Sequence, residues 1–140
     1  CGLCIASCPA LAIKADQGSD DNIVAKAGAQ NLVVFACERS GALAAGNLKE
    51  LKGLKIVTVP CVCRIGENVL LKTAESSEKI VLAGCHENNC RSIKGSKKAR
   101  TRVDWINKLP GSVSRDIHWF PVAANESERL QQFIKKTSTK

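Results

Sequence analysis

Three short apolar runs that each end in cysteine place the strongest constraint on how this chain folds. They occupy residues 31–37, 54–61 and 79–85, and each is rich in Val, Ile and Leu between polar or Gly-containing segments. Runs of this kind are typical of strands that are buried on both faces of a parallel sheet. Because ligands collect at the carboxyl ends of such strands, we expect the thiols of Cys37, Cys61 and Cys85 to meet at one edge, in a metal or iron–sulfur site.

The apolar runs alternate with segments of helical character. We predict strands at residues 31–37, 54–60, 79–84 and 117–122, and helices at residues 42–51, 67–76, 97–109 and 127–136. In the third helix, one face carries apolar residues that should point inward: Ala99, Val103, Ile106 and Leu109. Trp105 and Trp119 are expected to pack helix against sheet. The alternation predicts an α/β fold with a four- to five-stranded parallel sheet, a flavodoxin-like three-layer sandwich of strand order 2-1-3-4.

The amino-acid composition narrows the kinds of site that the cysteines can form. Eight cysteines in 140 residues are many for an α/β domain, and their even number allows a disulfide framework. Most of them lie in short clusters beside a good apolar core, which favours metal ligation. No membrane-length apolar segment and no signal peptide is visible, so we expect a cytoplasmic protein. No Gly-rich phosphate loop follows a predicted strand, and we identify no catalytic site for a small substrate.

The first residues carry a separate cysteine motif. Cys1, Cys4 and Cys8 follow the spacing Cys-x2-Cys-x3-Cys-Pro, which matches the latter part of the run that holds a [4Fe–4S] cluster in bacterial ferredoxins. The chain begins at Cys1 and contains no Met, so we expect it to be a piece of a longer polypeptide in which this [4Fe–4S] site is complete. By itself, the segment is expected to be a flexible tail.

These observations divide the chain into three predicted parts. Residues 1–14 contain the partial ferredoxin-type motif. Residues 15–30 are small and polar, and we interpret them as a linker. Residues 31–140 form the main α/β domain.

The net charge of +8 is concentrated in one segment. Residues 91–102 hold six basic side chains and no acidic one, which leaves only +2 for the rest of the chain. We call these six residues the basic patch: Arg91, Lys94, Lys97, Lys98, Arg100 and Arg102. Such cations favour the reduced form of a nearby thiolate cluster, and they also steer an acidic partner toward the surface. A solvated helix face is the plainer interpretation, and nucleic-acid binding is the weakest, because no aromatic residues interleave the charges.

Four motifs of the main domain carry a family resemblance. They are Phe35-Ala-Cys37, Pro60-Cys61-x-x-Arg64, Gly84-Cys85-His86-x-x-x-Cys90, and the helix start Gly95…Arg102-Val103. Together they resemble the delta subunit of methyl-viologen-reducing hydrogenase, over residues 31 to about 134. That domain also occurs fused to flavoproteins similar to the flavin-containing subunit of heterodisulfide reductase. The ferredoxin-type motif before the domain fits the fused arrangement.

The resemblance implies a function and a ligand set. The family carries a [2Fe–2S] cluster and passes electrons between a hydrogenase, or another donor, and the flavin of the heterodisulfide reductase-like subunit. By position, the implied ligands are Cys37, Cys61, Cys85 and Cys90. FAD is then expected elsewhere in the parent chain. The implied partners are acidic or flavin-containing redox subunits.

Two departures from the family pattern leave the ligand set open. Ser40 stands where the family has a second cysteine after the first strand, and Cys63 stands where the family has glycine. Five thiols thus remain for four positions: Cys37, Cys61, Cys63, Cys85 and Cys90. Two neighbours have open roles. His86 is expected to be a loop residue rather than a mixed ligand, and Arg64 either hydrogen-bonds cluster sulfur or fixes its own loop.

Two hypotheses about function follow. The first is an iron–sulfur electron-transfer domain without a substrate site of its own. The second is a zinc-binding or metal-free protein-interaction module that docks a partner through the basic patch, because zinc accepts the same four thiols.

Overall fold

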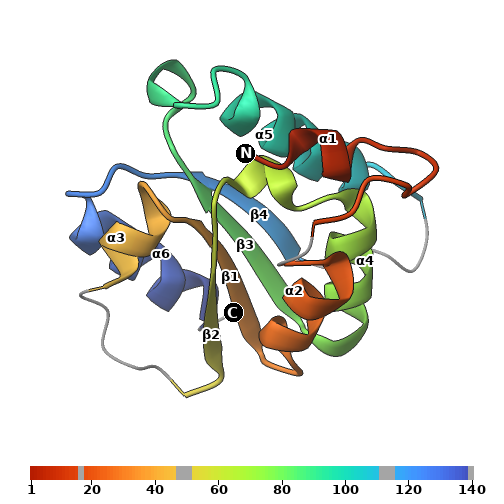
Figure 1. The fold of residues 1–140 in the computed structure, drawn as a ribbon. Helices are drawn as coiled ribbons and strands as arrows, with labels where there is room; N and C mark the ends of the chain where they lie inside the picture. The colour runs from red at the N-terminus through yellow and green to blue at the C-terminus, as the bar shows by residue number, and fades with distance from the viewer. Residues whose placement is uncertain (16–17, 47–51, 111–115, 139–140) are drawn as a thin grey trace.

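The chain folds into a three-layer α/β sandwich around a parallel sheet. The computed structural model describes residues 1–15, 18–46, 52–110 and 116–138. Their strands are β1 (Leu32–Cys37), β2 (Leu54–Val59), β3 (Lys79–Gly84) and β4 (Asp116–Pro121). All neighbouring strands are parallel, in the order β2-β1-β3-β4 (Figure 1). The predicted fold class and strand order are confirmed.

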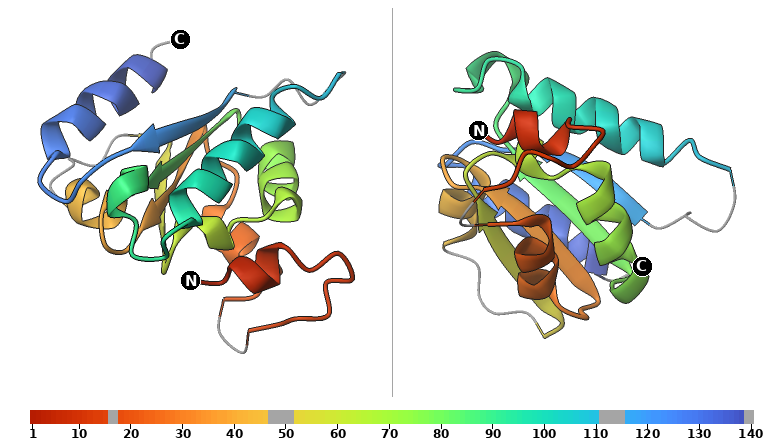
Figure 2. Two further views of the ribbon diagram at one scale, coloured as in Figure 1. Left: turned by 90° about the horizontal axis from the view of Figure 1, so that it is seen from above. Right: turned by 45° about the vertical axis from the view of Figure 1, so that its right-hand side comes forward.

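Helices cover both faces of the sheet (Figure 2). One face packs against α2 (Asp20–Ala27), α4 (Glu67–Ser76) and α5 (Gly95–Ile106), and the other against α3 (Gly41–Ala45) and α6 (Ser127–Ser138). Two 3-10 turns, η1 (Val62–Arg64) and η2 (Glu87–Asn89), follow β2 and β3. The short α1 (Leu3–Ala6) rests on η1, near the carboxyl ends of the strands.

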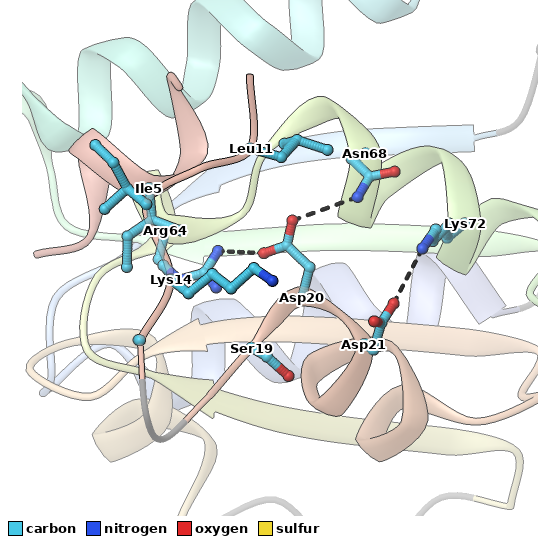
Figure 3. Close-up of a pocket in the computed structure, with 11 residues that line it drawn as sticks. Ile5, Leu11, Lys14, Ser19, Asp20, Asp21, Arg64, Asn68 and Lys72 are labelled. Atoms are coloured by element: carbon cyan, nitrogen blue, oxygen red, sulfur yellow. Dashed lines mark hydrogen bonds and ion pairs between the residues drawn. The ribbon is translucent and has the colours of Figure 1, made fainter. Parts of the chain in front are cut away.

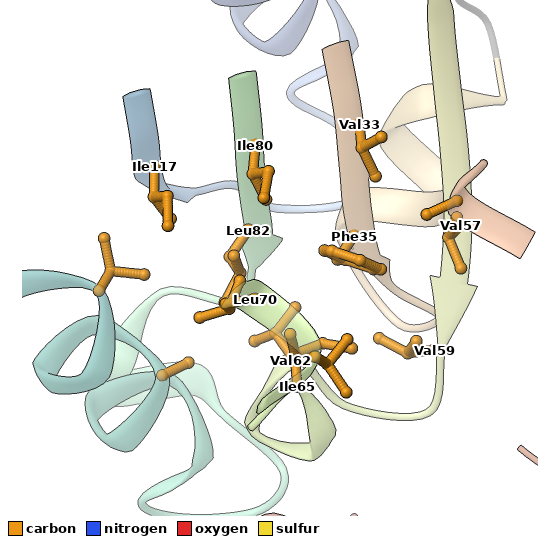
Figure 4. Close-up of a cluster of buried hydrophobic side chains, with 14 of the residues drawn as sticks. Val33, Phe35, Val57, Val59, Val62, Ile65, Leu70, Ile80, Leu82 and Ile117 are labelled. Atoms are coloured by element: carbon orange, nitrogen blue, oxygen red, sulfur yellow. The ribbon is translucent and has the colours of Figure 1, made fainter. Parts of the chain in front are cut away.

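The larger apolar core lies between the sheet and helices α2, α4 and α5 (Figure 4). Because alternate residues of a strand point to opposite faces, Val33 and Phe35 of β1 join this core, while Val34 and Ala36 join the core under α3 and α6. Phe35 is completely buried. Burial of a side chain of this size contributes about 1.5–3 kcal/mol to folding.

Burial of the strands follows their place in the sheet. Every residue of β1 is buried, and β3 is buried from Ile80 onward, as predicted. The prediction is wrong for β2, in which Lys55 and Thr58 are exposed while Val57 and Val59 are buried. The reason is that β2 is an edge strand, which the helices cover incompletely.

A helix occupies part of the segment that we interpreted as a linker. The Ser19 side chain caps α2 by accepting a hydrogen bond from the backbone N–H of Asn22 at 3.2 Å. Ile23 and Ala27 are buried in the larger core, against α4 and β2. One buried residue per turn is enough to attach a short helix to the sandwich, so residues 20–27 are packed structure and not linker.

The remaining helix predictions are confirmed in outline, with two differences. Of the helix predicted at residues 42–51, α3 accounts for the first turn, and residues 47–51 lie outside the described part of the chain. The predicted packing of Trp105 is wrong, because this side chain is 54% exposed on α5. Trp119 does pack on the larger core, where a Cβ on Gly84 would lie 2.5 Å from its ring.

Candidate metal centre

The carboxyl ends of β1, β2 and β3 bring three cysteines to one edge of the sheet. Cys37 is the last residue of β1, Cys61 follows β2 after Pro60, and Cys85 directly follows β3. The Sγ atoms of Cys37 and Cys85 lie 3.8 Å apart. Two thiolates on one tetrahedral metal, with bonds of about 2.3 Å, are separated by roughly 3.8 Å. This pair is therefore spaced like two ligands of one metal.

The start of α5 brings Cys90 to the same edge. The backbone N–H of Ser96 donates a hydrogen bond to Cys90 Sγ at 3.4 Å. A Cβ on Gly95 would lie 2.9 Å from Cys61 Sγ and 3.3 Å from Cys90 Sγ. Glycine thus lets the helix begin close to both thiols, and the positive end of a helix dipole favours thiolates.

A cavity of about 250 Å³ joins these thiols. Its lining includes the four cysteines of the implied ligand set, Cys37, Cys61, Cys85 and Cys90, together with Cys1. Cys63 lies behind this wall and has no exposed surface. Its S–H group is within donating distance of two acceptors, Cys61 Sγ at 3.4 Å and the carbonyl oxygen of Cys1 at 3.6 Å, and it can donate to one of them at a time.

The thiols around the cavity lie in close pairs and do not form a four-ligand metal site in this arrangement. Within the described residues, no three His, Cys, Asp or Glu side chains are grouped so as to hold one metal ion. All eight cysteines are free thiols. Four-thiol ligation in the cavity therefore requires the side chains to close around the bound group.

Hydrogen bonds among the thiols determine which one ionises first. Hydrogen bonds from Cys37, and then from Cys63, lower the pKa of the Cys61 thiol to about 2. The same hydrogen bonds, together with burial, raise the pKa of Cys37 and the pKa of Cys63. Cys61 is therefore the thiol of this group that ionises most readily, and the thiolate is the form that binds metals.

The buried hydroxyl group of Ser96 has no hydrogen-bond partner among the residues that the structure describes, and the backbone N–H of Ser96 contacts Cys90. The hydroxyl group of Ser40 interacts with the Cys37 thiol, where it opposes the rise in the pKa of that thiol. Buried polar groups are nearly always paired, so the Ser96 hydroxyl fits a site that receives a further acceptor, such as the sulfur of a cluster. Ser40 was noticed in the sequence as the position of a missing thiol. Ser96 was missed, and its only signal was its position after Gly95.

The N-terminal segment is packed against the domain, so the expectation of a flexible tail is wrong. A Cβ on Gly66 would lie 3.3 Å from the carbonyl oxygen of Ala6, which shows how closely α1 sits on the loop after η1. Of the three cysteines in the motif, Cys1 and Cys4 are exposed and Cys8 is half-buried.

The thiol of Cys8 lies among backbone N–H groups. Hydrogen bonds from Ile13 foremost, and from Ala12, lower the pKa of this thiol. Leu11 has a φ of 51°, a left-handed conformation that turns successive backbone N–H groups toward a common point. The turn after Pro9 thus favours a thiolate at Cys8.

Most of the basic patch is exposed, on the loop after Cys90 and along α5. The exposed members are Arg91, Lys94, Lys97, Lys98 and Arg100. The prediction that Arg102 belongs to a partner-binding surface is wrong, because this residue is only 7% exposed. It donates hydrogen bonds to Glu67 Oε1 at 2.9 Å, to the carbonyl oxygen of Cys63 at 3.3 Å, and to that of Ile65 at 2.8 Å. It braces the cysteine loop from inside and is not available to a partner.

Arg64 and His86, which neighbour the cysteines in the sequence, have structural roles. Arg64 forms an ion pair with Asp20 at 2.6 Å and donates to the carbonyl oxygen of Gly18 at 2.8 Å, so it fixes its loop. His86 lies 2.8 Å from Glu126 Oε2, as expected of a loop histidine.

Among the residues that the structure describes, none of the helices has the length and apolar character that a membrane crossing requires.

Comparison with known proteins agrees with the residues at the strand ends. A search of curated proteins found no match. The model of the family described as methyl-viologen-reducing hydrogenase, delta subunit, matches residues 32–140, which include the whole sheet and the cysteines that follow its strands. The chain therefore belongs to the family of the methyl-viologen-reducing hydrogenase delta subunit, and this membership indicates a part in electron transfer with hydrogenase.

Proposed function

We propose that this domain holds a [2Fe–2S] cluster and relays electrons between a hydrogenase, or another donor, and a heterodisulfide reductase-like flavoprotein. In this proposal the motif at Cys1, Cys4 and Cys8 completes a [4Fe–4S] site in a longer cytoplasmic polypeptide, and FAD lies elsewhere in that parent chain.

One observation carries the proposal. Cys37, Cys61, Cys85 and Cys90 line a single cavity, although they come from three strand ends and the start of a helix. Buried cysteines are common in protein cores, where they pack like small apolar residues. Four of them around one cavity fit a soft metal group better than a core.

The residues around the cavity have distinct tasks in this proposal. The four thiols hold the group, and the N–H of Ser96 stabilises the thiolate of Cys90. The hydroxyl group of Ser96 supplies a further donor. A bound [2Fe–2S] cluster supplies reversible uptake of one electron.

The surface beside Cys90 suits an acidic redox partner. Ile93 lies between Arg91 and Lys94 in the sequence, is 81% exposed and has a φ of 54°, strained for a β-branched residue. Charge of one sign speeds encounter with an oppositely charged partner, and a central apolar side chain adds contact area. We place the docking site for an acidic or flavin-containing subunit here.

Zinc is the main rival, because the 3.8 Å separation of Cys37 and Cys85 fits either metal. The test is anaerobic purification, followed by measurement of iron, acid-labile sulfide, zinc and visible absorption. The proposal expects about two irons and two sulfides per domain, with charge-transfer bands that bleach on reduction. Colourless protein with stoichiometric zinc, even after anaerobic reconstitution with iron and sulfide, would refute it and support an interaction module.

A further inference from the structure

Cys61 and Cys63 form a close pair of thiols in the loop after β2. Their Sγ atoms lie 3.4 Å apart, which is shorter than the 3.8 Å between the Sγ atoms of Cys37 and Cys85. Cys61 lines the cavity and is 4% exposed, whereas Cys63 is completely buried and lies outside the lining. A reagent that enters the cavity therefore meets Cys61 first, with Cys63 directly behind it.

The backbone between the two cysteines suits a disulfide bond. Val62 begins the 3-10 turn η1, and the backbone N–H of Arg64 closes this turn by donating to the carbonyl oxygen of Cys61 at 3.0 Å. One helical residue between two positions separates their Cα atoms by roughly 5–5.5 Å, inside the range of about 4.4–6.8 Å that a disulfide spans. The sulfur atoms need to approach by about 1.4 Å to reach a bond length of about 2.05 Å, which side-chain rotation supplies. The bond can therefore form with little change in the backbone.

Arg64 holds this loop in place (Figure 3). Its guanidinium pairs with Asp20 of α2 at 2.6 Å and donates to the carbonyl oxygen of Gly18 at 2.8 Å, and its side chain is only 6% exposed. The aliphatic part of the same side chain is in close contact with the N-terminal segment, since a Cβ on Gly2, whose φ is 81°, would collide with Cδ of Arg64. A loop fixed from two sides keeps its thiols together, and groups held at this distance combine far faster than separate molecules do.

We propose that Cys61 and Cys63 are a peroxide-reactive dithiol in the metal-free protein. The sulfur of Cys61 attacks one oxygen of hydrogen peroxide, the O–O bond breaks, and a sulfenic acid and one water form. The sulfur of Cys63 then attacks the sulfenic sulfur, the S–O bond breaks, and a disulfide and a second water form. In total the two thiols lose two hydrogens with two electrons, and one peroxide is reduced to two waters. A dithiol reductant reverses the oxidation by thiol–disulfide exchange.

This reaction gives Cys63 a task other than metal binding. A sulfenic acid that is left unpaired is oxidised further to a sulfinic acid, which most thiol reductants cannot reverse. Cys63 prevents this at Cys61 by converting the sulfenic acid into a reversible disulfide. While the disulfide persists, Cys61 cannot act as a thiolate ligand, so metal loading of the cavity requires prior reduction. The effect on loading rests on the proposed function, whereas formation of the disulfide does not.

The dithiol can be tested in metal-free protein from which the reductant has been removed under anaerobic conditions. One equivalent of hydrogen peroxide is added, the remaining thiols are alkylated, and tryptic peptides are analysed by mass spectrometry. Cleavage after Lys55 and Arg64 places both cysteines in one peptide, residues 56–64. We expect this peptide to be unalkylated and two hydrogens lighter than its reduced form, and the other cysteines of the chain to be alkylated.

Two variants identify the thiol that resolves the sulfenic acid. Cys63→Ser and Cys37→Ser each remove one buried thiol that neighbours Cys61. Cys63→Ser should lower the total disulfide yield at least about fivefold and lead to sulfinic acid at Cys61 in excess peroxide, whereas Cys37→Ser should leave the yield unchanged.

The result that would overturn the proposal is a disulfide that joins Cys37 to Cys61 or to Cys85, or an equal yield in Cys63→Ser and the unchanged protein. If Cys63→Ser fails to fold, the peptide map of the unchanged protein decides the matter by itself.

The effect on loading is measured with Co²⁺ alone, whose thiolate absorption reports binding to the cavity thiols. We expect the reduced protein to bind Co²⁺, the peroxide-treated protein to bind it at least about tenfold more weakly, and binding to return after reduction and removal of the reductant. Equal binding by the reduced and oxidised forms contradicts the effect on loading. Absence of iron and sulfide from fully reduced, reconstituted protein contradicts the proposed function instead, and the peptide map still decides whether the dithiol exists.

Discussion

The thiols of Cys37 and Cys85 lie 3.8 Å apart although 48 residues separate them in the sequence. They meet because β1 and β3 are parallel neighbours, with Ala36 paired to Ala83 just before the two cysteines. The start of α3 also lies directly against β3, because a Cβ on Gly41 would collide with the carbonyl oxygen of Ala83. The closeness of the two thiols is thus a consequence of the strand order.

The first prediction separates the two candidates for the fourth ligand. Cys90 lines the cavity, whereas Cys63 is completely buried behind Cys61. We expect Cys90→Ser to reduce bound iron and sulfide to background after anaerobic reconstitution, and Cys63→Ser to retain the amounts found in the unchanged protein. The opposite result would show that Cys63 takes the position that Ser40 leaves without a thiol.

The second prediction concerns Gly95, where stability and metal binding should respond in opposite directions. Gly95 is the first residue of α5, and alanine is favoured over glycine in a helix, by up to about 1 kcal/mol at interior positions. The new Cβ would lie 2.9 Å from Cys61 Sγ, 3.3 Å from Cys90 Sγ and 3.1 Å from the Cβ of Ser92, and the two thiols would turn to make room for it. Gly95→Ala should therefore leave thermal stability equal or higher and lower the iron bound on reconstitution.

Gly46→Ala is the control for Gly95→Ala. Gly46 lies at the end of α3 with a φ of −57°, and its nearest contact would be the carbonyl oxygen of Leu43 at 3.4 Å. This substitution should leave iron binding unchanged. A normal iron content in Gly95→Ala would show that the close approach of α5 to the thiols is unimportant for metal binding.

The third prediction tests the inward orientation of Arg102. Arg102→Met removes donors from the carboxylate of Glu67 and from the carbonyl groups of Cys63 and Ile65. Unpaired polar groups of this kind cost about 2 kcal/mol, which should appear as a lower free energy of unfolding in denaturant titrations. Arg100→Met is the matched control, because Arg100 is 57% exposed in its pair with Glu87 and should change stability by less than about 0.5 kcal/mol. Equal effects of the two substitutions would contradict the assignment.

The sheet could be predicted from the sequence because buried parallel strands are continuous apolar runs, and the runs of β1 and β3 are of this kind. The strand order then brought Cys37 and Cys85 together without further information. Helix α2 was missed because only Ile23 and Ala27 of its eight residues are buried, too few for a clear apolar periodicity. The readable signal was its cap, Ser19 followed by two acidic residues.

The inward orientation of the Arg102 side chain could have been predicted from the sequence, but the prediction placed it on the surface. The three-and-four spacing that places Ala99, Val103 and Ile106 inside α5 also places Arg102 on that face and Trp105 away from it. Attachment of the N-terminal segment was beyond prediction. It depends on the φ of Gly2 and on the path of Arg64 between two segments, and neither is encoded in a local pattern.

Glu126 connects the loop after β3 to the start of α6. Its carboxylate accepts hydrogen bonds from His86 at 2.8 Å, from the backbone N–H of Ala123 at 2.7 Å and from Arg129 at 3.2 Å. The hydrogen bond from His86 contributes most to lowering the pKa of Glu126 to about 2, from an ordinary value of 4.5.

The final prediction follows from this shift. A carboxylate whose pKa is lower in the folded protein than in the unfolded chain stabilises the fold above pH 4.5, and this contribution is lost as the pH falls from about 4.5 to about 2. Glu126→Gln should therefore be less stable than the unchanged protein at pH 7, and the difference should shrink through that acidic window. Glu128→Gln, at an exposed position in the first turn of α6, is the control and should change the stability at pH 7 by less than Glu126→Gln does. A stability difference for Glu126→Gln that is constant from pH 7 to pH 2.5, measured by denaturant unfolding of the metal-free protein, would show that the carboxylate charge is not what holds this loop.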